Sequence, residues 1–436
     1  FGIILLFIFI SLLKMMIKFF IQNKALLFFL PVIVSLLFLL VEFKYATAFT
    51  TMLAFLTFLY LVFGKKGSLF LFLVAGAFLV RILLVLLNDQ LGFLPFQPDS
   101  VQYTKQAMRI LDNVSRNLPL YNDMPFSTGI KSYALFLAQF YAVVGEMPLV
   151  AQIVNVILGI LSAVIIYKIA ILVFQDERIA LFALICSLFF PTIIAFTSYV
   201  LRDPLVLFLT LLMLYYLILA SKSQHKFFHV LFACLLFIIV SIIRMQNLYL
   251  YGLFFALFYS YLFIKSDVKR SFKFVFLVGL SALVLFIVYA YYDLIISIAN
   301  YPLRAQPLRA VGGSAYLQHL QYNSLLDIFK YLPIRVLYFT FGPFLWQANS
   351  AFLLLAALEG MLIFAACLFT VFYFAKKRIS INFDLQLFLI LFCLVGLFAN
   401  SMVDSNFGTA VRHRMNYIIF FFIFAGAYLR HFRIRL

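Results

Sequence analysis

The sequence predicts an all-α, polytopic helical membrane protein with about 12–14 transmembrane helices. Of its 436 residues, 66% are hydrophobic and 11% are charged, whereas about a quarter of the residues in a soluble domain are charged. Apolar runs of about 17–25 residues, long enough to cross a bilayer as a helix, recur along nearly the whole chain. The short alternating strands typical of an outer-membrane barrel are absent from the pattern. Composition and run length therefore both indicate membrane-spanning helices.

The net charge of +18 agrees with this class. No soluble basic domain is present to bind nucleic acid, so nucleic acid is not an expected partner. An excess of Lys and Arg in cytoplasmic loops is the usual source of such a charge in a polytopic protein. The four cysteines lie inside apolar runs, which favours small core residues over disulfides or a metal site.

The expected helices are separated by two long interruptions, at 89–147 and 294–350. Residues 1–22 contain Lys14 and Lys18 and lack a small-residue cleavage site, which favours a partial or interfacial helix over a signal peptide. The chain divides into extra N-terminal helices (1–67), a central helical module (68–293), an external loop (294–350) and C-terminal helices (351–436). Spanning helices are expected at 25–43, 46–64, 68–88, 148–174, 178–200, 204–220, 227–243, 247–264, 272–293, 351–375, 384–403 and 416–433.

The distribution of Lys and Arg sets the expected orientation, because cytoplasmic loops carry an excess of both. The face that carries most of the basic loop residues, together with the C-terminus, is expected to be cytoplasmic. Both long interruptions then lie on the opposite, periplasmic or lumenal side. To keep this orientation, the apolar stretch 132–147 must lie in the outer interface without crossing, and 332–347 is expected to be re-entrant or interfacial. The basic clusters on the cytoplasmic face comprise Lys65, Lys66, Lys222, Lys226, Lys265, Lys269, Arg270, Lys273, Lys376, Lys377, Arg378, Arg430, Arg433 and Arg435.

The external stretch "QPDSVQYTK" places an aspartate just after an apolar run. Helical spacing puts Asp99, Tyr103 and Gln106 on one face of a short helix. One interpretation makes Asp99 the N-cap of that helix, its carboxylate accepting from the amides of Val101 or Gln102. The other makes Asp99 a catalytic or substrate-binding carboxylate, and a carboxylate fixed at a helix start is well oriented to act as a base.

A second polar group, "SYVLRDPL", lies at the outer end of the expected helix 178–200. Here Arg202 and Asp203 precede Pro204, and Asp before Pro is a common helix start. The pattern also places a second carboxylate on the same face as Asp99.

Several arginines occupy external positions that the positive-inside rule disfavours. A guanidinium group binds phosphate oxygens through two hydrogen bonds, which suits a lipid-phosphate ligand. The alternative is that these arginines pair with acidic residues or lipid headgroups. His413 lies between two of them, and deeper in the membrane Arg81 and Glu359 are expected to form a buried ion pair. The external arginines are Arg244, Arg304, Arg309, Arg335, Arg412 and Arg414.

The order of these features over residues 68–220 resembles the polytopic GT-C glycosyltransferases that use polyprenyl-phosphate-linked sugars, such as mannosyl and aminoarabinosyl transferases. "PDSVQYTKQAMRIL" is similar to the D-x-x-x-Y-x-x-x-A stretch of that family's first external loop. "VVGEMPLVAQIVNVILGILSAVIIYKIAILVF" and "ALICSLFFPTIIAFTSYVLRDPLVLFLTLLMLYYL" follow the family's rhythm of a glycine after the interfacial helix, a proline in the next outward helix and an acidic residue, here Asp203, opening the one after.

The resemblance implies a GT-C-like fold and transfer of a sugar from a polyprenyl-phosphate donor to a glycan, lipid or protein acceptor. Asp99 would be the base, and Asp203 would orient the acceptor or position Arg202. No cofactor is expected; this loop has Asp99 alone at the place where some family members carry paired acids, so a divalent metal is not indicated. The implied substrate-binding residues are Tyr103, Lys105, Arg202, Arg244, Arg304, Arg309, Arg335, Arg412, His413 and Arg414.

Three other functions are compatible with the sequence. A polysaccharide polymerase or ligase of the O-antigen type also has many helices, external arginines and a long loop such as 294–350. A lipid-glycan flippase or secondary transporter would need polar groups near the midplane and two related halves, and no internal repeat is found. A non-catalytic subunit with partner membrane subunits is the third. The expected location is a bacterial inner membrane, with the active site facing the periplasm.

Overall fold

The computed structural model describes residues 43–63, 68–92, 94–95, 97–122, 128–265, 292–376 and 382–430, with a few isolated positions between 269 and 289. The helices expected at 1–22 and 25–43, and most of that at 272–293, lie outside these residues. Throughout the described ranges the secondary structure is helical, with one isolated β-bridge between Ala315 and Asn406. The predicted all-α class is therefore confirmed.

The N-terminal helices pack around one long central helix. This helix, α7 (Pro148–Phe174), contacts both α3 (Phe43–Phe63) and α4 (Ser68–Leu91). The first predicted external loop contains two helices that pack on each other, α5 (Pro98–Ser115) and α6 (Thr128–Val144). Both α5 and α7 begin at a proline, which has no amide hydrogen to leave unpaired in a first turn.

The expected single helix at 178–200 is in fact two helices. α8 (Glu177–Phe189) and α9 (Pro191–Thr197) meet at a 58° bend. The break has a local cause, because Phe190 is extended and Pro191 cannot donate an amide hydrogen back into α8. After a turn at 198–202 the chain enters α10 (Asp203–Ala220), followed by α11 (Lys226–Ile243) and α12 (Gln246–Lys265).

The C-terminal part begins with two short helices, α14 (Tyr292–Ala299) and α15 (Tyr301–Arg309). The stretch 332–347 is the second half of α16 (Leu325–Phe341), a turn and the 3-10 helix η2 (Leu345–Gln347). Three long helices complete the described chain: α17 (Ala351–Ala375), α18 (Phe383–Ser401) and α19 (Phe407–Leu429).

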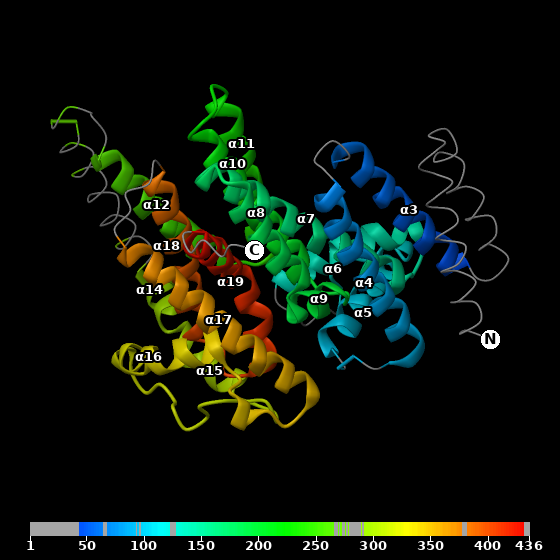
Figure 1. Ribbon diagram of the computed structural model, residues 1–436. Coiled ribbons are helices and arrows are strands. Elements are labelled where there is room, and N and C mark those ends of the chain that lie inside the picture. The colour runs from blue at the N-terminus through cyan, green and yellow to red at the C-terminus, as the bar shows by residue number, and fades with distance from the viewer. Residues whose placement is uncertain are drawn as a thin grey trace.

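Seven helices of the described ranges are long and apolar enough to cross a membrane, or eight if α8 and α9 form one bent span. They are α4, α7, α10, α11, α12, α17 and α18. α19 is buried over nearly its whole length and contacts α7, α8, α9, α10, α16, α17 and α18, so it forms the core between the two groups of helices seen in Figure 1.

Helices of the two long interruptions lie toward one end of the molecule. In Figure 1, α5 of the first interruption and α15 and α16 of the second lie toward the lower end, whereas the connection between α10 and α11 is at the upper end. This separation agrees with the predicted grouping of loops. The membrane side of each end, and the predicted domain boundaries, stay predictions.

Candidate active site

Asp99 lies in the first turn of α5, but it does not cap the helix. The N-cap residue is Gln97, and its side chain makes no capping hydrogen bond. The Asp99 carboxylate instead accepts a hydrogen bond from Arg412, with 2.6 Å between Oδ2 and Nη1. The predicted capping interaction with Val101 or Gln102 is therefore wrong, because a charged partner from α19 competes successfully with local amides. The Asp99 side chain remains 43% exposed.

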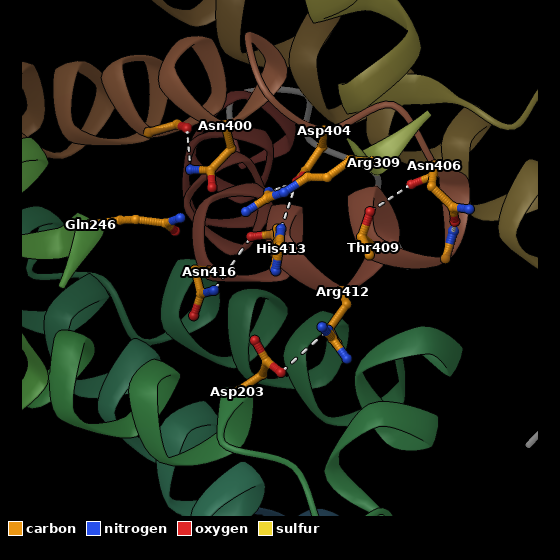
Figure 2. A network of polar contacts seen from close by, with 12 residues as sticks. Asp203, Gln246, Arg309, Asn400, Asp404, Asn406, Thr409, Arg412, His413 and Asn416 are labelled. Atoms are coloured by element: carbon orange, nitrogen blue, oxygen red, sulfur yellow. Dashed lines mark hydrogen bonds and ion pairs between the residues drawn. The ribbon is translucent and has the colours of Figure 1, made fainter. Parts of the chain in front are cut away.

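Asp203 opens α10, as the sequence predicts, and its carboxylate lies between two guanidinium groups. Oδ2 lies 3.3 Å from Nε of Arg412, and Oδ1 lies 3.4 Å from Nη1 of Arg244. In contrast to Asp99, the Asp203 side chain is only 1% exposed. Figure 2 shows the Asp203–Arg412 pair at the boundary between α10 and α19. We call Asp99, Asp203, Arg244 and Arg412 the acid–arginine cluster.

Arg244 reaches this cluster from the turn between α11 and α12, which agrees with the helices expected at 227–243 and 247–264. Its side chain is buried, and burial lowers the pKa of Arg244 below its ordinary value, while Asp203 beside it acts in the opposite direction. Two buried charges that face each other in this way compensate part of the desolvation that each would otherwise suffer.

Tyr103 and Arg202 border the acid–arginine cluster, whereas Lys105 does not. Tyr103, one turn after Asp99, is buried, and burial raises the pKa of its hydroxyl, with further electrostatic contributions from Arg202 and Asp203. Arg202 is half-buried, and its Nε atom is buried without a hydrogen-bond partner in the described structure. Lys105 is exposed on another face of α5.

A second charged cluster lies next to the first and contains an acid that the sequence reasoning missed. Asp404, between α18 and α19, pairs with Arg309 of α15, and its Oδ2 lies 2.5 Å from Nδ1 of His413. Burial alone would raise the pKa of Asp404, but His413 and Arg309 hold it well below its usual range. In the sequence, Asp404 could have been noticed as an isolated acid shortly before Arg412, His413 and Arg414. Figure 2 shows this Asp404 cluster beside Arg412.

The remaining predicted arginines bind protein groups. Arg335 donates to Ser405 Oγ and to the carbonyl of Leu320, both at 2.9 Å. Arg414 donates to the carbonyls of Thr340 and Gly342 at the end of α16, and Arg304 is exposed and bound to Ser297. The structure thus brings Asp99, Tyr103, Arg202, Asp203, Arg244 and Arg412 to one region, with Arg309 and His413 at the adjoining Asp404. Lys105 and Arg304 are exposed, and Arg335 and Arg414 bind serine and backbone carbonyl oxygens.

The predicted ion pair between Arg81 and Glu359 is wrong. Arg81 donates to Thr197 Oγ1 and to the carbonyl of Ala77, and its third nitrogen has no hydrogen-bond partner in the described chain. Glu359 accepts from the amide of Thr192. The two residues bind opposite ends of α9, because equal depth in the membrane does not fix the direction in which each side chain points.

The turn that carries Arg202 and Asp203 is held by two buried side chains. Asn155 of α7 donates to the carbonyls of Tyr199 and Leu201, at 2.6 and 2.9 Å. The hydroxyl of Tyr199 donates to the carbonyl of Pro95, 2.8 Å away, in the segment that leads into α5. These bonds connect the chain segments that precede Asp99 and Asp203, so the positions of the two carboxylates are coupled.

The guanidinium of Arg412 bridges the carboxylates of Asp99 and Asp203. Among the residues that the structure describes, no group of three or more His, Cys, Asp or Glu side chains has the arrangement of a metal site.

Part of the chain matches a protein-family model. Residues 132–292 match the family model described as dolichyl-phosphate-mannose-protein mannosyltransferase. This segment is less than half of the chain; it includes Arg202, Asp203 and Arg244 but not Asp99 or Arg412. No curated protein and no solved structure matches the chain. Together with its apolar helices, the family match supports a GT-C-like membrane glycosyltransferase, as the sequence resemblance predicts.

Proposed function

We propose that the protein transfers a sugar from a polyprenyl-phosphate donor to an acceptor at the acid–arginine cluster. The observation that carries this proposal is Arg412, which contacts one exposed and one buried carboxylate, Asp99 and Asp203. An accessible base, an orienting acid and unpaired guanidinium nitrogens are what such a transfer needs.

The difference in exposure assigns the two acids different roles. Asp99 is the accessible carboxylate and takes the proton from the acceptor hydroxyl. The acceptor oxygen then forms a bond to the anomeric carbon of the sugar, while the bond from that carbon to the phosphate oxygen breaks. The polyprenyl phosphate leaves with the bonding electron pair. Asp203, buried between Arg244 and Arg412, keeps these guanidinium groups in place.

The leaving phosphate would be stabilised by arginine. Arg202 is the best-placed donor, because it is half-buried and its Nε has no partner in the described residues. Arg412 also has an Nε without a hydrogen bond, although it lies within ion-pair distance of Asp203. A guanidinium group that already faces the site needs little reorganisation when charge develops on the phosphate.

The test is a transfer assay on the purified protein with a radiolabelled polyprenyl-phosphate sugar. Asp99→Asn and Asp203→Asn are compared with Asp112→Asn, a matched control whose exposed carboxylate on α5 pairs with Arg116. We expect the rate of sugar transfer to fall at least about a hundredfold in both cluster variants and to stay at the wild-type value in the control. Transfer that survives both substitutions would refute the assignment, and donor binding by the wild type without any transfer would favour a carrier.

A further inference from the structure

Glu359 of α17 is an acid in an apolar helix that the proposed chemistry does not use. Its side chain is 1% exposed, and Oε1 accepts a hydrogen bond of 2.6 Å from the amide nitrogen of Thr192. Thr192 is the second residue of α9, and Pro191 before it has no amide hydrogen. The N-cap residue Phe190 provides no side-chain acceptor. Glu359 therefore supplies, from another helix, the cap that α9 lacks in its own sequence.

The other end of α9 is fixed as well. Thr197, its last residue, accepts a hydrogen bond from Arg81 and packs directly on Gly159 of α7, where an added Cβ would lie 2.6 Å from Thr197 Cγ2. The turn that follows is held by Asn155 and ends at Asp203. Because both ends of α9 and the turn that follows it are fixed by contacts with other helices, the position of α9 determines where Asp203 lies.

The second oxygen of Glu359, Oε2, is buried without a hydrogen-bond partner in the described chain, and Arg414 of α19 is near enough to attract the carboxylate electrostatically. Arg414 likewise has two buried nitrogens, Nε and Nη2, without partners, while Nη1 donates to the carbonyls of Thr340 and Gly342. Arg414 lies two residues after Arg412 on α19.

We propose that Glu359 is a positioning residue that sets Asp203 against Arg412. One carboxylate oxygen caps the helix that leads to Asp203, and the carboxylate attracts Arg414 on the helix that carries Arg412. A buried acid in a membrane helix is costly, and here it bonds Thr192 on the Asp203 side of the acid–arginine cluster and attracts Arg414 on the Arg412 side. The expected effect of Glu359 on sugar transfer rests on the proposed function, whereas its expected effect on the position of Asp203 relative to Arg412 does not.

The test compares Glu359→Ala and Glu359→Gln with Thr370→Val, a matched control. Thr370 is a buried polar residue of the same helix whose hydroxyl donates to the carbonyl of Ala366. Gln keeps an oxygen that can accept from Thr192, whereas Ala removes it. If the Ala variant does not fold, Glu359→Leu, which fills the volume, replaces it.

The geometric readout is the distance between spin labels at positions 105 and 308, in a background whose four native cysteines are replaced by alanine. Both positions are exposed, on α5 and α15, one on each side of the boundary. We expect the Ala variant to shift or broaden the distance distribution, and the Gln and Val variants to match the wild type. An unchanged distribution in a folded Ala or Leu variant would overturn the inference.

The kinetic readout is sugar transfer at a temperature where every variant is folded. We expect kcat/KM to fall at least about tenfold for Ala and less than about threefold for Gln and for the control. A Gln variant as slow as Ala would refute the capping role. If the wild type transfers no sugar, the proposed function fails, and the spin-label distances still decide the positioning inference.

Discussion

Arg412 Nη1 lies 2.6 Å from Asp99 Oδ2, although the two residues are 313 positions apart in the chain. The same guanidinium lies 3.3 Å from Asp203, so one side chain from the C-terminal half joins the acids of two N-terminal helices. The regions outside the family match therefore supply two of the four residues of the acid–arginine cluster, Asp99 and Arg412.

Replacing Arg412 by Lys is expected to lower transfer at least about tenfold. A single ammonium group cannot contact Asp99 and Asp203 with the geometry of a guanidinium. Arg412→Ala should also destabilise the fold by about 3–5 kcal/mol, because it removes a partner from the buried Asp203. Transfer kinetics and thermal melting of Arg412→Lys, Arg412→Ala and the exposed control Arg116→Lys would measure both effects. Wild-type transfer by Arg412→Lys would contradict the bridging role.

Replacing Gly360 by Ala is expected to destabilise the protein by about 1–3 kcal/mol. A Cβ at this position of α17 would lie 2.0 Å from the carbonyl oxygen of Phe341, where α16 ends against α17. Gly76→Ala on α4 is the control, because a Cβ there meets nothing within 4 Å and alanine favours a helix. Thermal unfolding should show a lower melting temperature for Gly360→Ala only. Equal melting temperatures would mean that the helices do not approach this closely.

Asp404 predicts how stability depends on pH. The pKa of Asp404 is depressed in the folded state. Its contribution to the free energy of unfolding is therefore fully present above the ordinary aspartate pKa of about 3.9, and it is lost as the pH falls through the lower pKa of the folded state. Asp404→Asn should therefore lower the melting temperature by a constant amount between about pH 8 and pH 5. Asp384→Asn, which removes an exposed pair with Lys265, should have little effect. A difference between wild type and Asp404→Asn that shrinks already near pH 6 would contradict the depressed pKa.

The orientation of the chain is tested by labelling single introduced cysteines in intact cells. Lys105 and Lys222 are both exposed and lie on α5 and in the connection between α10 and α11. A membrane-impermeant maleimide should label Lys105→Cys from outside and Lys222→Cys only after the membrane is opened. The reverse pattern would overturn the predicted periplasmic or lumenal site.

The sequence predicted those features that depend on local chemistry. Apolar run length predicted most of the long helices, including α7 and α10, which have Pro148 and Pro204 in their first turns. The spacing of Asp99, Tyr103 and Gln106 predicted the short helix α5, which begins at Pro98. Counting Lys and Arg grouped Asp99 and Asp203 on one face, and the structure places both in contact with Arg412.

Contacts between helices that are far apart in the chain could not be predicted from the sequence. Asp404 has no motif around it, and only the fold shows that His413 and Arg309 surround it. The expected Arg81–Glu359 pair failed because helix depth gives one coordinate, whereas pairing also depends on rotation about the helix axis and on neighbouring helices. The capping role predicted for Asp99 failed for a related reason, since its partner comes from α19.

The most direct test of sugar transfer at the acid–arginine cluster separates donor binding from chemistry in Asp99→Asn. Equilibrium binding and single-turnover transfer would be measured with the same radiolabelled polyprenyl-phosphate sugar. If Asp99 is the base, the variant should bind the donor within about threefold of the wild type and transfer it at least about a hundredfold more slowly. Wild-type single-turnover transfer by this variant would contradict the central claim.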